Sequence, residues 1–422
     1  MSFLGEYYNT ILVILGAVLL STVSGLSGVF AFIRKKSLMG DVVAHSVLPG
    51  IILAFITFQS RNPLILLLGA LLSGGLSISF TNWLSNKAKI KEDAALAFAM
   101  TVFFALGVCL MYTLQNTGQL AQAGLNDFLF GKAAAINQED LIWLSSAAIF
   151  IVIILALFYR SILVFSFSES FAQATGLPVK FLNFILTVAL VWNISISLQT
   201  TGVVMSAALM ITPAASARFW TDSLKGMFIL SALFGAISGA FGACVSLWIS
   251  NMPTGPWIVI ALTVIAVISF AFSPKGRIVN LVKNYRMNAR LAVENLIKNL
   301  YKITENADDK SVSVETLKNF YNPGPKEWKR GLNTARISHY VWLENGRISL
   351  SEKGKHYAGQ IVRAHRLWEL YIATFAKVPD EWIHADAEHF EHFIGHLEQK
   401  ELLKVLNNPM EDPHNKPIPP YE

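Results

Sequence analysis

Asp41 and His45 are two potential cation ligands within a strongly apolar part of the chain. They lie in the stretch Ser37–Gly50, which reads SLMGDVVAHSVLPG. Their separation of four residues places both side chains on one face of a helix, one turn apart. Ionisable groups at the depth of a lipid bilayer are costly, and they commonly mark an ion or proton path. The pattern therefore leaves two interpretations open: a pair that holds a passing cation, or an Asp–His hydrogen bond that locks two helices together.

A second set of potential ligands lies close to the C-terminus. Imidazoles and carboxylates recur there at the spacing of successive helical turns, so they form stripes on two consecutive helices. The set contains no thiolate, and such nitrogen and oxygen donors suit Mn²⁺ or Fe²⁺ and tolerate Zn²⁺. The alternative is a pair of solvated amphipathic helices with incidental histidines. The six residues are His365, Glu369, His384, Glu388, Glu391 and His392.

The elements that must position these residues differ in kind between two parts of the chain. The 422 residues are 53% hydrophobic and 15% charged, but apolar runs dominate up to about Ser273 and charged residues crowd the remainder. Nine apolar segments are long enough to span a bilayer as helices. The seventh is short and rich in Ser, Thr and Pro, as a re-entrant segment would be. The segments are residues 11–33, 38–58, 64–84, 94–114, 141–158, 181–198, 202–217, 227–249 and 257–272.

The distribution of basic residues favours nine spans. Clusters of Lys and Arg follow the odd-numbered segments, whereas the alternate loops hold only Arg61 and Lys132. The positive-inside rule places these clusters and the C-terminal part in the cytoplasm, with the N-terminus outside. Eight spans would break this alternation unless one segment is re-entrant. We therefore predict an all-α polytopic membrane protein of about nine spans, or eight, followed by a mainly α cytoplasmic domain.

Two of the connecting loops have features of interaction sites. The long external segment 115–140 is suited to docking a partner that delivers substrate. The cytoplasmic loop 161–180 contains a short predicted helix from Glu169 to Thr175, which Gly176 and Pro178 end. An ordinary interhelical connector is the alternative for this loop.

Three motifs together resemble the membrane permease of manganese/zinc/iron ABC importers, over about residues 12–272: SLMGDVVAHSVLPG, FSESFAQATGLP and SLQTTGVVMSAALMITPAASAR. The resemblance implies a homodimeric permease in the bacterial cytoplasmic (inner) membrane. It implies two ATP-binding subunits and an extracytoplasmic metal-binding protein as partners. It also implies that Asp41 and His45 line the metal path, and that Glu169, Ala172 and Gly176 belong to a coupling helix seated on the ATPase.

The chain is then expected to be a transport subunit and not an enzyme. No Walker A motif occurs in the sequence, so a separate subunit must hydrolyse ATP. One carboxylate and one imidazole per protomer, doubled by symmetry, make a weak site, and a conduction site must release its ion. The expected cargo is a divalent transition metal, with Mn²⁺ favoured over Zn²⁺ and Fe²⁺, and no bound organic cofactor is expected.

The C-terminal part begins with a pattern typical of a winged-helix module. A helix-compatible run at 284–303 carries an apolar face, and two further helices are predicted at 314–320 and 326–340. The sequence VWLENGRISL predicts a hairpin with Asn345-Gly346 at its turn. Such modules bind DNA or act as protein-interaction domains. We expect a permease domain at 1–274, a linker and winged-helix part at 275–350, and a metal-binding part at 351–422.

The segment from HRLWEL to NPMEDPHNKPIP resembles the metal-sensing and dimerisation domain of the diphtheria-toxin-repressor family of metal-dependent regulators. The resemblance covers roughly residues 289–420 and is strongest after Ser351. Glu388 stands where iron-type members carry Cys, which favours Mn²⁺. Asn295 falls at the position of the first-helix ligand and is a weaker donor, so the second site is expected to be incomplete. The resemblance assigns His365, Glu369 and His384 to one site, and Glu388, Glu391 and His392 to its neighbour.

Three hypotheses follow for the tail. The leading one is a cytoplasmic metal sensor that restrains the permease when metal is replete. The alternative is a membrane-tethered, metal-dependent regulator that binds DNA, although the poor match to the family at residues 322–336 argues against DNA as a partner. The third is a tail that only stabilises the permease dimer, with vestigial metal sites.

Overall fold

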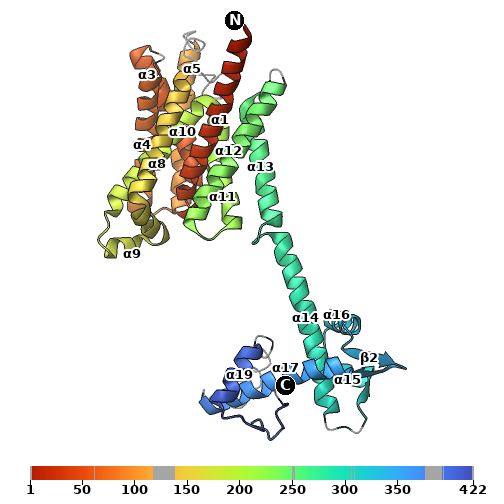
Figure 1. Cartoon of the computed structure of the whole chain (residues 1–422). Coiled ribbons are helices and arrows are strands. Elements are labelled where there is room, and N and C mark those ends of the chain that lie inside the picture. The colour runs from red at the N-terminus through yellow and green to blue at the C-terminus, as the bar shows by residue number, and fades with distance from the viewer. Residues whose placement is uncertain are drawn as a thin grey trace. The chain divides into compact units, whose positions relative to one another are not determined.

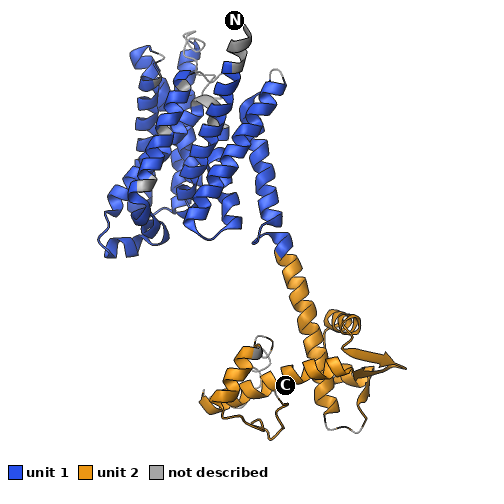
Figure 2. Ribbon diagram, viewed as in Figure 1, with its two compact units in different colours: residues 1–279 blue, residues 280–422 orange. Residues whose placement is uncertain are grey.

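The chain, described here from a computed structural model, forms two compact units, residues 1–279 and 280–422 (Figure 2). The structure describes residues 2–60, 62–116, 138–249, 252–305, 307, 309–375, 392 and 394–420. Most of the predicted external loop 115–140 therefore lies outside the described residues. So do His384, Glu388 and Glu391 of the predicted tail sites.

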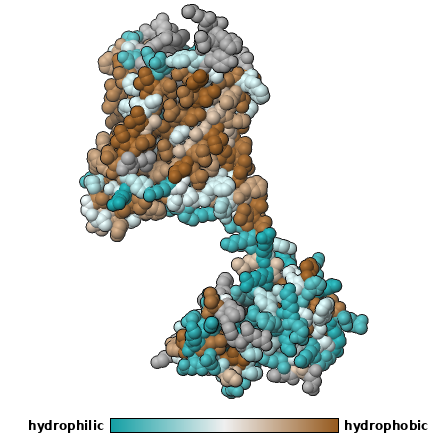
Figure 3. Space-filling view, viewed as in Figure 1, coloured by the Kyte–Doolittle hydropathy of each residue, from teal (hydrophilic) through white to brown (hydrophobic). Residues whose placement is uncertain are grey.

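The first unit is a bundle of helices throughout its described residues (Figure 1). Apolar side chains cover most of the face of this bundle that Figure 3 shows. Large apolar side chains such as Leu72 and Phe184 are exposed on the surface of the unit. Apolar surface of this extent requires lipid, and helices satisfy their backbone hydrogen bonds within it. The elements are α1 (Ser2–Ile33), α2 (Leu38–Ser46), α3 (Leu48–Phe58), α4 (Pro63–Lys87), α5 (Glu92–Asn116), α8 (Gln138–Phe167), α9 (Glu169–Ala174), α10 (Val179–Thr201), α11 (Val203–Trp220), α12 (Leu224–Trp248) and α13 (Thr254–Phe272).

By length and composition, seven helices of the described chain can cross a membrane, and a bent pair within α8 makes eight if it counts as one span. Helix α11 is not among them. It nevertheless runs parallel to α13. A Cβ on Gly255, early in α13, would lie 2.8 Å from Met205 near the start of α11, and Lys275 after α13 pairs with Asp222 after α11. The prediction of an all-α polytopic protein is confirmed, and the preferred count of nine requires α11 to cross beside α13.

Helix α9, which connects α8 to α10, lies at one end of the bundle (Figure 1). Arg34, which follows α1, donates to Asn183 of α10 at 2.8 Å and lies over the ring of Phe165 near the end of α8. Lys36 pairs with Glu92 at the start of α5 at 2.6 Å. These contacts bring the ends of α1 and α8 and the starts of α5 and α10 to one side of the bundle.

The second unit combines a small sheet with helices. The strand order is β1-β3-β2, and both strand pairs are antiparallel. Asn345 and Gly346 have φ angles of 47° and 76°, which the tight turn between β2 and β3 requires and which these two residue types tolerate. The elements are α14 (Arg277–Thr304), β1 (Ser311–Ser313), α15 (Val314–Tyr321), α16 (Pro325–Ile337), β2 (Val341–Glu344), β3 (Arg347–Leu350), α17 (Glu352–Phe375) and α19 (His396–Val405).

The core of this unit lies between α14 and the winged-helix elements. Leu296 and Leu300, on the apolar face of α14, are fully buried against Leu317, Ala335 and Ile348. The predicted helices and hairpin are present. The third strand, β1, was not predicted, because three residues are too few to display an alternating pattern.

Candidate metal sites

Asp41 and His45 lie on the same helix, α2, one turn apart. The distance from His45 Nε2 to Asp41 Oδ1 is 3.7 Å, which exceeds hydrogen-bond length. The side chains are partly accessible, at 43% for Asp41 and 23% for His45. A pair within one helix and without a hydrogen bond cannot lock two helices together, so the structure disfavours that interpretation.

The His45 ring is held in place from one side and has an unsatisfied nitrogen. The edge of Phe104 on α5 packs against it, with ring centroids 5.0 Å apart and planes at 87°. Nδ1 is buried and has no hydrogen-bond partner within the described residues. A buried imidazole nitrogen without a partner is costly. A ligand that bonded to Nδ1 would remove that cost. Nε2 is the nitrogen that lies near Asp41, so a carboxylate and an imidazole nitrogen are together there as donors that suit a cation cargo.

A break in the helix sets the position of this pair. α2 ends at Ser46, and α3 begins at Leu48 with Pro49 in its first turn. Proline has no N–H to donate to the carbonyl of His45, four residues earlier. Ser73 of α4 donates to the carbonyl of Ser46 at 2.5 Å, and the hydroxyls of Ser46 and Ser77 are 2.8 Å apart.

Helices α3 and α4 meet through glycine backbone beside this break. A Cβ on Gly50 would lie 2.1 Å from the carbonyl oxygen of Gly69, and a Cβ on Gly69 would lie 2.4 Å from that of Gly50. Gly69, Ser73 and Ser77 recur every four residues and therefore share one face of α4. That face of α4 supports the broken helix and thereby the orientation of His45.

The short helix α9 has defined ends. Ser168 caps it by accepting from the backbone N–H of Phe171 at 3.2 Å, and Gly176 follows it in the left-handed region with a φ of 77°. Ala172 is fully buried, whereas the Phe171 ring is 59% exposed. Glu169 occupies the first turn, where its negative charge complements the helix dipole. α9 is thus anchored on one face and presents an aromatic ring on the other.

The tail contains a buried pair, His365 and Glu369, on α17. Each side chain is 2% exposed, and His365 Nε2 lies 3.3 Å from Glu369 Oε1. Lys302 of α14 approaches the same nitrogen, with Nζ at 3.5 Å. His384, the third ligand expected here, is outside the described residues. An imidazole and a carboxylate shielded from water are suitable donors for a divalent metal.

His392 contacts α14 through both ring nitrogens. Nδ1 lies 2.7 Å from Glu294 Oε2, and Nε2 lies 3.2 Å from Asn295 Oδ1. The structure thus brings the predicted weak ligand Asn295 to His392, while Glu388 and Glu391 lie outside its described residues. No group of three or more His, Cys, Asp or Glu residues suited to a metal occurs within the described part of the chain. The structure therefore describes His365 and Glu369 of the first predicted tail site, and His392 and Asn295 of the second.

Glu294 is a participant that the sequence interpretation missed. Its side chain is 2% exposed and also accepts from Tyr357 and from Arg290, the latter at 2.7 Å. Burial alone would raise the pKa of Glu294, but hydrogen bonds from His392, Tyr357 and Arg290 outweigh it and lower the pKa below its usual value. The sequence gives little signal for this role, because Glu294, Lys298 and Lys302 are spaced four residues apart and resemble a charged, solvated helix face.

Arg366, next to His365 on α17, connects this helix to the end of α14 and to the C-terminal segment. It makes a two-pronged ion pair with Glu305 at 2.9 and 2.6 Å and donates to the carbonyl of Pro417. Its Nε lies 3.5 Å from Asp412 Oδ2. Paired guanidinium and carboxylate groups of this geometry hold their partners firmly. The segment around Asp412 and Pro417 is therefore fastened to α17 beside the buried ligand pair.

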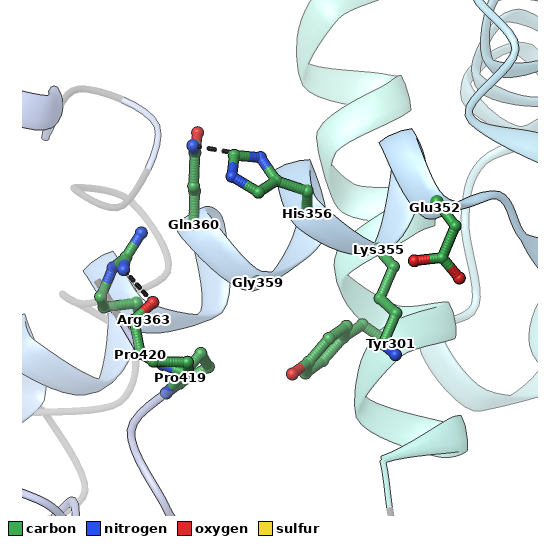
Figure 4. Close-up of a pocket in the computed structure, with 9 residues that line it drawn as sticks. All are labelled: Tyr301, Glu352, Lys355, His356, Gly359, Gln360, Arg363, Pro419 and Pro420. Carbon is green, nitrogen blue, oxygen red and sulfur yellow. Dashed lines mark hydrogen bonds between the residues drawn. The ribbon is translucent and has the colours of Figure 1, made fainter. Parts of the chain in front are cut away.

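A small polar cavity of about 220 Å³ lies along α17 before His365 (Figure 4). Arg363 bounds it by donating to the carbonyl of Pro420 and, through Nε, to Gln399 at 3.0 Å. Neither His365 nor His392 is among the residues that line it. The lining residues are Tyr301, Glu352, Lys355, His356, Gly359, Gln360, Arg363, Pro419 and Pro420.

The sequence of residues 6–273 matches the model of the family described as the ABC 3 transport family. The chain belongs to the ABC 3 transport family. Residues 351–420 of this ABC 3 permease match a second family model, described as iron dependent repressor, metal binding and dimerisation domain. Both resemblances seen in the sequence are thereby confirmed.

Several relatives of the ABC 3 permease are named as metal transport proteins. It is 32% identical over 403 residues to the manganese transport system membrane protein MntC of Bacillus subtilis (strain 168), across 95% of this chain and 92% of the relative. It is 37% identical over 263 residues to the zinc transport system membrane protein TroC of Treponema pallidum (strain Nichols), across 62% of this chain and 88% of the relative. The solved structure described as PsaBC from Streptococcus pneumoniae in complex with Fab matches with a TM-score of 0.57 and 31% identity, over 64% of this chain and 93% of that chain. The first of these similarities extends through the tail.

Proposed function

We propose that this ABC 3 permease conducts a divalent transition metal, with Mn²⁺ favoured and Zn²⁺ or Fe²⁺ as the other cargoes, across the bacterial cytoplasmic membrane. The Asp41–His45 pair carries the proposal. It offers one carboxylate and one imidazole on a single face of α2, and a buried nitrogen of that imidazole has no partner in the described chain. The relatives named for manganese and zinc transport support the choice of metals.

Conduction follows from weak binding at this pair. Two copies of the chain, facing each other across the path, would offer two oxygen and two nitrogen donors to the metal. Such a site holds Mn²⁺ less firmly than a closed cage of thiolates would hold Zn²⁺, and an ion in a path must leave as readily as it enters. The role of Phe104, Ser73 and Ser77 is to keep the imidazole oriented while the metal exchanges ligands.

The two ends of the helix bundle offer docking positions for the two partner proteins of the importer. A separate ATP-binding subunit would dock at α9, where Phe171 is exposed and Ala172 anchors the helix. The basic residues that follow the odd-numbered segments favour a cytoplasmic location for that end and for the tail. An extracytoplasmic binding protein would deliver metal at the opposite end.

Substitution of the ligand pair tests the proposal. We expect Asp41→Asn and His45→Ala each to reduce ATP-driven ⁵⁴Mn²⁺ uptake in proteoliposomes at least a hundredfold, because each removes a donor from the path. Co-purification with the ATPase and the dimer should be unchanged. Loss of assembly in either variant would restore the structural interpretation of the pair, and full uptake in both would remove them from the path.

We further propose that the tail senses cytoplasmic metal and restrains uptake when its sites fill. The buried His365–Glu369 pair and the His392–Glu294 contact are its candidate ligand pairs, and each combines an imidazole with a carboxylate. Metal that bridged α17, α14 and the segment containing His392 would stiffen the tail. A sensor joined to the permease would measure the product of that same permease.

One observation favours DNA binding as a second candidate function. On α16, which is followed by the β2–β3 hairpin, four exposed polar residues recur at spacings of three, four and three residues and so form one stripe: Lys326, Lys329, Asn333 and Arg336. Basic side chains and an amide on a single helix face are suited to the DNA backbone and base edges. Sequence-selective binding of the full chain to a duplex, weakening steeply with salt, would favour this candidate.

A further inference from the structure

Three charged residues follow one another on the face of α14 that meets α17. Glu294, Lys298 and Lys302 are spaced four residues apart and therefore share one side of the helix. Glu294 contacts Tyr357 of α17, and Lys302 contacts His365 of α17, so this side faces α17 at both ends. Lys298, between them, is only 3% exposed. The α14 face beside the candidate tail sites thus carries two lysines.

Lys302 lies beside the nitrogen that a metal would use. Its Nζ is 3.5 Å from His365 Nε2, and Glu369 Oε1 is 3.3 Å from the same nitrogen on α17. A transition metal bound to an imidazole nitrogen sits roughly 2.1 Å from it. An ammonium group at the observed distance borders the volume that such a metal and its remaining ligands would need.

The ammonium of Lys302 and the carboxylate of Glu369 both lie within 3.5 Å of His365 Nε2. Glu369 is 2% exposed, and a carboxylate so shielded from water requires a compensating charge or hydrogen bonds. A divalent metal that arrives at the same pair meets a like charge at short range, and like charges in a poorly solvated site repel strongly. The lysine must swing away before the metal can bind.

We propose that the Lys302 ammonium is a tethered competitor of the metal at the His365–Glu369 pair, and that it sets the metal concentration at which this tail site fills. The proposal rests on the metal-sensing role proposed for the tail. Lys302 does not bind the metal. Its positive charge repels the metal, and its ammonium group occupies space beside the ligands that the metal needs. A competitor of this kind raises the metal concentration at which the tail site fills, and it leaves the metal ligands unchanged.

The test measures metal binding directly and does not depend on transport. Full-length protein in detergent, carrying Asp41→Asn and His45→Ala to remove the path site, is titrated with Mn²⁺ while the free ion is followed by electron paramagnetic resonance. We expect Lys302→Met, which keeps most of the length of the side chain but removes its charge, to tighten Mn²⁺ binding at least tenfold. Adding His365→Ala to Lys302→Met should abolish the gain.

Two matched variants separate the charge of Lys302 from other effects. Lys302→Arg keeps the charge and should leave the affinity within about twofold of the parent. Lys355→Met removes the same charge from an exposed position ten residues before His365 on α17, and it should leave the affinity unchanged. Lys302→Gln serves as a second neutral variant, and the thermal unfolding midpoint of each protein reports whether it has folded.

The outcomes distinguish this inference from the function on which it rests. If the parent binds Mn²⁺ in a manner that requires His365, and neither Lys302→Met nor Lys302→Gln binds it more tightly, the competitor role is wrong and the sensing role stands. If no variant binds Mn²⁺ in the tail, both are wrong. Equal tightening by Lys355→Met would show a general effect of net charge and would also overturn the competitor role.

Discussion

At the scale of single residues, Asp41 with His45 and His365 with Glu369 each combine a carboxylate and an imidazole one turn apart on a helix, and a side chain from another helix packs against each imidazole. The four-residue spacing of Asp41 and His45 was enough to predict a shared helix face. The contacts of the ring were not predictable from it, because Phe104 lies on α5, far along the chain. The same holds for the tail. The four-residue spacing predicted that His365 and Glu369 share a helix face, but the contact of His365 with Lys302 depends on the packing of α14 against α17.

Glu294 gives a test of residue-scale electrostatics in the tail. Its pKa is lowered in the folded protein, so its ionised form stabilises the fold above the pKa of an unfolded glutamate, about 4.3, and this contribution is lost as the pH falls through the lower folded pKa. We expect Glu294→Gln to reduce the free energy of unfolding by about 1–3 kcal/mol at pH 7, because it removes hydrogen bonds to a buried charge. The difference from wild type should shrink as the pH falls below about 4.3.

Thermal and denaturant unfolding of the full chain between pH 3 and pH 7 measures this difference. Glu401→Gln is the matched control, because the Glu401 carboxylate is 69% exposed and pairs only at the surface with Lys404. It should change stability by less than about 0.5 kcal/mol at any pH. A pH-independent deficit in Glu294→Gln would mean that the charge of Glu294 is not what stabilises this region.

At the scale of elements, the helices were predictable and their breaks and contacts were only partly so. Each of the nine apolar segments is helical, because long apolar runs leave a membrane-spanning chain few other ways to satisfy its backbone. The interruption after Ser46 was not predicted, although Pro49 is a visible signal for it. The close contact of Gly50 with Gly69 depends on tertiary packing and has no signature in either segment alone.

The glycines of α4 provide a paired test of this packing. Gly69→Ala would place a Cβ 2.4 Å from the carbonyl oxygen of Gly50, whereas Gly75→Ala would place one with no atom within 4 Å. We expect Gly69→Ala to lower stability by about 1–3 kcal/mol and to reduce metal uptake, because α4 must move away from the broken helix. Gly75→Ala should be neutral or stabilising by up to about 1 kcal/mol, since alanine favours the helix.

Thermal stability in detergent and initial uptake rates in proteoliposomes, measured side by side, check this pair. Reduced uptake with unchanged stability in Gly69→Ala would still place the α3–α4 contact in the transport mechanism. Indistinguishable behaviour of the two variants would show that the contact between Gly50 and Gly69 does not matter.

At the scale of the whole molecule, composition alone separated a membrane part from a charged tail. The change near Ser273 lies close to the division between the two compact units after residue 279. The hairpin of the winged-helix part was also predictable from the sequence, because the adjacent pair Asn345-Gly346 favours a tight turn. Of the six predicted tail ligands, His365, Glu369 and His392 lie within the described residues, and His384, Glu388 and Glu391 lie outside them.

Removal of the second unit tests whether the tail regulates the permease. A chain that ends after Val279 keeps α13 and the ion pair between Lys275 and Asp222. We expect its ATP-driven uptake to continue when the proteoliposome interior contains Mn²⁺ at concentrations that slow the intact protein at least fivefold, because the sensor is gone. The full chain with His365→Ala is the control that retains the tail, and it should resemble the truncated chain. Equal inhibition of the intact and truncated proteins by internal Mn²⁺ would exclude regulation by the tail.

The single carboxylate in the Asp41–His45 pair has a consequence for the valence of the cargo. Two facing copies would contribute two negative charges and two neutral imidazoles, so a divalent ion would leave the site electrically neutral. A monovalent ion would leave one negative charge uncompensated and a trivalent ion one positive charge, and uncompensated charge at bilayer depth is costly. The permease would then discriminate among cations by formal charge before it discriminates by size or by preference for nitrogen donors.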